Sequence, residues 1–124
     1  MRISKRFDEF IKEGIVRKHN PDLIRAKDVL NETERNMVFL NNLKQKMPLS
    51  DENSNNYVEI IYNIILGKIR VKMLLEGYKA SGFSAHEAEV SYMVNLGFSE
   101  ADVEFMNELR YSRNGMLYYG QKFE

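Results

Sequence analysis

The chain has 124 residues, the size of one ordinary domain, and 44% of them are hydrophobic, which is enough for a packed core. Eighteen Lys and Arg balance eighteen Asp and Glu, so the strongly basic composition typical of duplex-DNA-binding proteins is absent. The lack of cysteine excludes disulfides, thiolate zinc sites and cysteine nucleophiles. Because no apolar run is long enough for a membrane span and no apolar signal core begins the chain, we expect a soluble, cytoplasmic protein.

The first two helices are predicted from apolar spacing and a proline. Residues 4–18 have apolar side chains at the helical spacing i, i+3, i+4 and i+8. These side chains are Phe7, Phe10, Ile11 and Ile15. Pro21 interrupts the pattern and suits the first turn of the next helix, which we expect to end near Lys46.

A third helix is predicted over about residues 54–78, after a polar loop that covers residues 47–56. Its apolar residues form a wide stripe, so we expect this helix to be central and to contact several others. Aromatic and methionine side chains at helical spacing are expected to pack in the core. They are Tyr57, Tyr62, Tyr92, Met93, Phe105 and Met106.

Two capping patterns mark the last two helices. Ser84 has an acidic residue three positions later, which is the spacing of a capping box, and Gly97 is expected to end this fourth helix. Ser99 and Asp102 predict the start of a fifth helix, which Gly120 ends. No run alternates with period two, so we expect no strand. The predicted fold is all-α, an antiparallel, up-and-down bundle of about five helices in a single domain, residues 1–124.

Charge is unevenly distributed along the chain. Residues 1–27 contain eight Lys or Arg and four acids, whereas residues 82–109 contain six acids and no Lys or Arg. Solvated helix faces explain both segments, and association between the unlike patches is the alternative.

The two histidines do not predict a metal or catalytic site. His86 is expected in the first turn of the fourth helix as an exposed residue, and His19 in the loop before the second helix. No zinc-protease, phosphate-loop or nucleophile-elbow motif is present. We therefore expect neither a metal nor a cofactor.

Near the C-terminus, polar residues occupy the packed side of the predicted fifth helix. Residues four apart form two neighbouring rows on a helix. One row is Leu109, Arg113 and Leu117, and the other is Arg110, Asn114 and Tyr118. A buried Arg113 needs a partner, for which Glu59 and Glu76 are candidates. Gly115 costs about 1 kcal/mol relative to Ala within a helix, which a close approach to another helix or a ligand would justify.

These residues resemble the signature of the HEPN domains (higher eukaryotes and prokaryotes nucleotide-binding). Those domains are small helical bundles with an R-x4-6-H motif, whose Arg is often followed by a polar residue. Here the sequence is R-N-x-x-x-Y-Y-G, with Tyr118 in the histidine position. The stretch LLEGYKASGFSAHEAEVSYM, residues 74–93, is similar to the long helix, glycine turn and short His-bearing helix of the family. The order of the predicted helices and the overall length also agree with the family, so the resemblance covers most of the chain.

The resemblance implies a homodimer, or a complex with a nucleotidyltransferase partner in a toxin–antitoxin or RNA-defence system. It also implies a cleft at the dimer interface, where Arg113 and Asn114 bind RNA or a nucleotide, together with Arg110 and Tyr119. Many members are metal-independent ribonucleases, and catalysis here would use Arg113 and Tyr118. A phenol titrates near pH 10, so Tyr118 is a poor general base.

Three functions therefore stay open at this point. The first is a HEPN-like domain that binds RNA or a nucleotide without cleaving it. The second is an active metal-independent endoribonuclease. The third is a non-catalytic interaction module in which Arg113 is a structural ion-pair partner.

Overall fold

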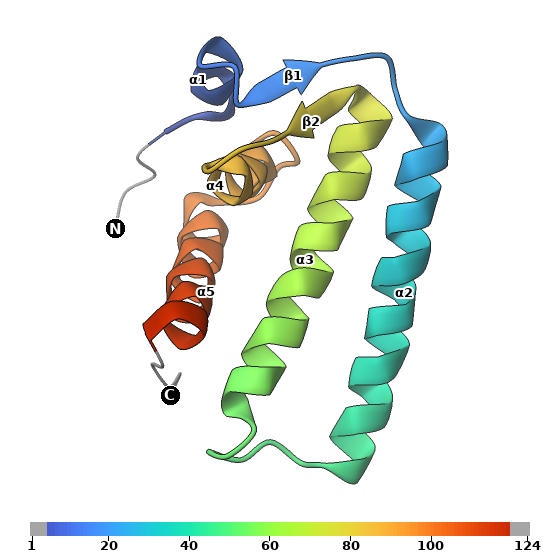
Figure 1. The fold of residues 1–124 in the computed structure, drawn as a ribbon, viewed down its shortest axis with the longest axis vertical. Helices are drawn as coiled ribbons and strands as arrows, with labels where there is room; N and C mark the ends of the chain where they lie inside the picture. The colour runs from blue at the N-terminus through green and yellow to red at the C-terminus, as the bar shows by residue number, and fades with distance from the viewer. Residues whose placement is uncertain (1–4, 120–124) are drawn as a thin grey trace.

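The computed structural model describes residues 5–119, with side chains described as far as Ser112. This part of the chain is an all-α bundle, as predicted, with a small two-stranded sheet at one end (Figure 1). Its elements are α1 (Phe7–Lys12), β1 (Val16–Lys18), α2 (Leu23–Lys46), α3 (Ser54–Glu76), β2 (Tyr78–Ala80), α4 (Ala85–Ser91), the 3-10 turn η1 (Tyr92–Val94) and α5 (Glu100–Tyr119).

The prediction of no strand is wrong. β1 and β2 pair antiparallel, with Val16 opposite Ala80 and Lys18 opposite Tyr78. Each strand has only three residues, too few for an alternating pattern to be recognised. The predicted first helix over residues 4–18 is consequently too long. It ends at Lys12, and Gly14 then adopts a positive φ of 79° that turns the chain into β1.

The central position of α3 is confirmed, since it contacts α2 along one side and α4, α5 and β2 along others. Figure 1 shows α2 and α3 as two long helices side by side and antiparallel, with α4 and α5 beside α3. The main core lies on the α4 and α5 side of α3. Of α2, only Ala26 and Thr33 are buried, so this helix packs as a single outer layer against α3.

The core predictions are confirmed for five of the six side chains. Tyr57, Tyr62, Tyr92, Met93 and Met106 are all buried. Phe105 is 55% exposed, so its predicted place in the core is wrong. The inward face of α5 carries Val103, Met106 and Leu109, which turns Phe105 outward.

Gly77 fixes how the second helix is attached to the third. It has a φ of 86°, and a Cβ at this position would collide with the carbonyl oxygen of His19. The His19 N–H donates a hydrogen bond of 2.6 Å to the Gly77 carbonyl, and the Asp22 N–H donates one of 3.0 Å to the Leu74 carbonyl. The loop between β1 and α2 is therefore held directly against the end of α3.

Of the two predicted capping boxes, the structure has one. Ser84 precedes α4, but its side chain makes no capping hydrogen bond. At α5 the predicted box is present: the Asp102 N–H donates to Ser99 Oγ at 3.2 Å, and the Ser99 N–H donates to Asp102 Oδ2 at 3.4 Å. The fourth helix ends earlier than predicted, since α4 ends at Ser91 and η1 at Val94; Gly97, with a φ of 92°, lies in the turn that follows. No helix in the described part of the chain is both long and apolar enough to cross a membrane.

Candidate functional site

Most of the predicted C-terminal site lies outside the described side chains. The α5 backbone continues to Tyr119. The side chains not described include those of Arg113, Asn114, Tyr118 and Tyr119.

Arg110 is the one predicted site residue whose side chain is described. It is half-buried, its Nε donates to Asn107 Oδ1 at 3.4 Å, and its guanidinium lies 4.7 Å from the centre of the Tyr111 ring.

The two carboxylates expected to pair with Arg113 have partners of their own. The Tyr92 hydroxyl donates a hydrogen bond to Glu76, and the Asn63 amide donates one of 3.2 Å to Glu59. Burial first, and then the contact with Glu76, raise the pKa of the Tyr92 phenol. Tyr92 is thus a structural hydrogen-bond donor between α3 and η1.

The structure shows a second cluster of polar side chains that the sequence did not indicate. A pocket of about 560 Å³ lies between the β1–β2 ribbon, α2, α3 and the start of α4. Its charged lining consists of Arg17, Arg25, Arg70, Lys79 and Glu89, with His19 at the side. Four basic side chains therefore face one carboxylate, and we call this the basic pocket.

The ribbon places two of these cations side by side. Arg17 on β1 and Lys79 on β2 are directly opposite each other in the register. Because side chains alternate between the faces of a strand, both lie on the face opposite Tyr78, whose ring packs 5.1 Å from Phe7 in the core. Like charges directly opposite in an antiparallel pair are destabilising. The ribbon therefore maintains a repulsion that an anion would relieve.

Arg25 adds a third cation from α2. It lies in the first turn of the helix, where its N–H donates to the capping carboxylate of Asp22 at 3.0 Å. A cation in the first turn is at the unfavourable end of the helix dipole, and this turn contains no acidic residue. The Asp22 carboxylate offsets part of this cost, and a bound anion would offset more of it.

Arg70 is the fourth cation, and a carboxylate of the described part of the chain holds it. Glu89, whose side chain is 6% exposed, accepts from Arg70 Nε at 2.7 Å and from Nη2 at 3.2 Å. His86 Nδ1 lies 3.1 Å from the same carboxylate. His86 is 46% exposed, as predicted, and its role here is to fix Glu89.

The other three cations are unpaired. Within the part of the chain that the structure describes, the side chains of Arg17, Arg25 and Lys79 make no ion pair or hydrogen bond. With Glu89 offset by Arg70, three positive charges are left in excess around one pocket. Among the described lining residues, Glu89 is the one carboxylate.

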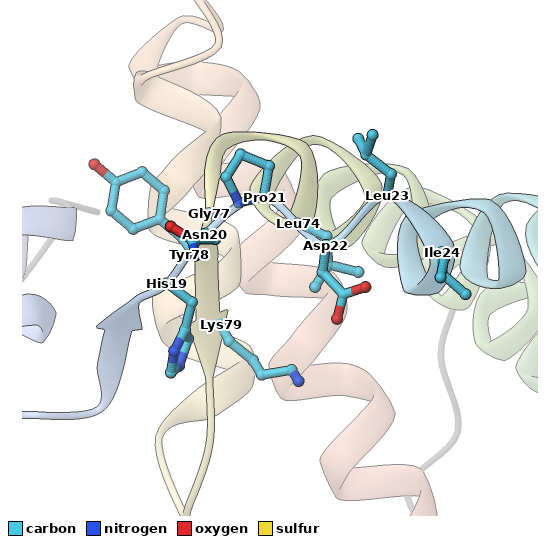
Figure 2. Close-up of a pocket in the computed structure, with 10 residues that line it drawn as sticks. All are labelled: His19, Asn20, Pro21, Asp22, Leu23, Ile24, Leu74, Gly77, Tyr78 and Lys79. Atoms are coloured by element: carbon cyan, nitrogen blue, oxygen red, sulfur yellow. The ribbon is translucent and has the colours of Figure 1, made fainter.

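A second hollow of about 660 Å³ adjoins the basic pocket and shares His19, Leu74, Tyr78 and Lys79 with it. Figure 2 shows that His19 and Lys79 extend to the same side of the ribbon, whereas the Tyr78 ring points away from them. The far wall of this hollow includes Leu23 and Ile24, which are 65% and 81% exposed. The charged site therefore continues into a more apolar surface.

Comparison with protein-family models, curated proteins and solved structures finds no match. Among the described residues, no group of three or more His, Cys, Asp or Glu is arranged to hold a metal ion. The chemistry of the basic pocket is that of an anion-binding site. Its guanidinium groups can donate paired hydrogen bonds to phosphate or carboxylate oxygens.

Proposed function

We propose that this chain binds the phosphate groups of RNA or of a nucleotide in the basic pocket. The observation that carries the proposal is the set of three unpaired cations, Arg17, Arg25 and Lys79, which come from three elements of a chain with zero net charge. Two of them occupy positions that cost stability in the free protein, opposite each other on the ribbon. Binding sites often keep such locally unfavourable residues because the ligand requires them.

The HEPN-like assignment is part of the same proposal. A long α3, the turn at Gly77 and the short α4 that carries His86 support it, because the resemblance of residues 74–93 rests on that order of elements. Under this assignment the C-terminal row with Arg113 forms a cleft in a homodimer, or contacts a nucleotidyltransferase partner in a toxin–antitoxin system.

Metal-independent ribonuclease activity is the alternative function, because Arg113 is followed by Asn114 as in active members of the family. It requires Tyr118 to replace the histidine. Cleavage of single-stranded RNA in EDTA that is lost in Arg113→Ala would support it. An interaction module without a ligand is the second alternative, and it predicts no binding in any of these assays.

The binding proposal is tested by fluorescence anisotropy with labelled single-stranded RNA and with a labelled nucleotide at fixed salt. We expect the double variant Arg17→Ala/Lys79→Ala to bind at least about tenfold more weakly, since each phosphate contact contributes to a salt-dependent affinity. Lys44→Ala/Lys46→Ala is the matched control, because it removes two exposed charges from the far end of α2. Equal loss in both variants, or none in either, would contradict the proposal.

A further inference from the structure

The number of positive charges in the basic pocket indicates how much negative charge its ligand carries. We infer that the pocket holds a compact polyphosphate group, such as the diphosphate or triphosphate of a nucleotide, and not the internal phosphodiesters of an RNA strand. The inference rests on the proposed function and narrows it to one class of ligand.

The first argument is charge matching. Three positive charges in excess surround a single pocket of about 560 Å³. An internal phosphodiester carries about one negative charge, and a strand distributes these charges one per nucleotide along its length. A terminal phosphate carries close to two at neutral pH, and a diphosphate carries more within the same small volume. Only the polyphosphate places about three negative charges inside one pocket.

The second argument is the arrangement of the cations. Arg17 and Lys79 stand on the ribbon, and Arg25 faces them from α2 across the pocket. The three cations therefore line one pocket from three elements. A site for a strand needs a groove of cations along the backbone.

The third argument is that the described lining has no series of exposed rings on which successive bases could stack, since His19 is its one exposed ring. Strand-binding sites stack successive bases on exposed aromatic rings. Tyr78 is the one aromatic residue other than His19 in the described lining. Its ring packs against Phe7 and Tyr92, with centroid distances of 5.1 and 5.8 Å, and Lys18 covers it at 5.3 Å. This ring is occupied by the core and by Lys18, so it offers no face to a base.

Glu89 positions the fourth cation for the same ligand. It binds Nε and Nη2 of Arg70, which leaves Nη1 without a hydrogen-bond partner in the described structure. The guanidinium is thus fixed in the lining of the pocket with one donor group that Glu89 does not bind. The adjoining hollow, with Leu23 and Ile24 in its wall, gives the organic part of a phosphate ester an apolar surface (Figure 2).

Isothermal titration calorimetry at constant ionic strength tests the inference with four probes: inorganic phosphate, pyrophosphate, ADP and a short single-stranded RNA with a 5′-hydroxyl. We expect pyrophosphate and ADP to bind at least about tenfold more tightly than phosphate or the RNA. Arg17→Ala/Lys79→Ala should abolish this preference, and Lys44→Ala/Lys46→Ala should keep it. If Arg17→Ala/Lys79→Ala does not fold, Arg25→Ala removes a cation of the same pocket from α2 and should weaken the binding of pyrophosphate.

The outcomes separate the two proposals. If RNA binds and depends on Arg17 and Lys79 while pyrophosphate does not bind, the ligand class is wrong but the proposed function holds. If no probe binds, both are wrong. If pyrophosphate binds equally well to the wild type, Arg17→Ala/Lys79→Ala and Arg25→Ala, the anion site lies elsewhere and the inference is overturned.

Discussion

At the scale of single residues, the basic pocket contains positive charges whose positions lower the stability of the free protein. Arg17 and Lys79 face each other across the ribbon, and Arg25 occupies a helix N-terminus. Arg70 differs because a buried carboxylate holds it in a fixed position. The other three are exposed, so water solvates them without a partner; the main argument for an anionic ligand is that they line one pocket, with Arg17 opposite Lys79.

Lys79→Glu is expected to stabilise the free protein, because it converts a like-charge cross-strand pair into an opposite-charge pair. The gain should be about 0.2–1 kcal/mol relative to Lys79→Gln, which removes the charge without adding a partner. Urea unfolding followed by circular dichroism measures the difference. If the Glu variant is less stable than the Gln variant, Arg17 and Lys79 do not face each other as described.

At the scale of the elements, the site depends on how the β1–α2 loop is attached to α3. The amide of His19 binds the Gly77 carbonyl, and Gly77 leaves no room for a Cβ beside the His19 carbonyl. This contact sets the position of the ribbon relative to α2. It therefore determines the distance between Arg25 and the two cations of the ribbon.

Gly77→Ala should destabilise the protein more than Gly82→Ala does. Both glycines have a positive φ, of 86° and 91°, so both substitutions carry the same backbone strain. A Cβ at Gly82 meets open space, whereas one at Gly77 meets backbone. We expect an additional cost of roughly 1–3 kcal/mol for Gly77→Ala, measured by thermal or urea unfolding. An equal loss of unfolding free energy in the two variants would show that the His19 carbonyl does not lie in contact with Gly77.

The elements also show what the sequence could and could not predict. The end of α2 at Lys46 and the Ser99 cap follow from helical spacing and Asp102, which are local signals. Pro21 lies just before α2 and not in its first turn, because Asp22 is the N-cap. The ribbon was missed because three-residue strands have no readable period, and Arg17 was assigned to a helix. The sequence shows the excess of positive charge in residues 1–27. That Arg17 and Arg25 line the same pocket as Arg70 and Lys79 depends on the tertiary structure.

At the scale of the whole molecule, α3 separates two surfaces. The basic pocket lies on the first, between α2, the ribbon and the start of α4, and the main core lies on the second, between α3, α4 and α5 (Figure 1). On this second side, Phe98 and Phe105 are 48% and 55% exposed. A dimer cleft that includes Arg113 would belong to the α5 side. The proposed phosphate site and the predicted dimer cleft are therefore on different elements.

The most direct test of the central claim is a ¹H–¹⁵N NMR titration of the chain with pyrophosphate. We predict that the largest amide shifts are at Arg17, Arg25 and Lys79 and at their neighbours in β1, β2 and the first turn of α2. Largest shifts along residues 109–119 of α5, with none in the ribbon, would contradict a phosphate site in the basic pocket.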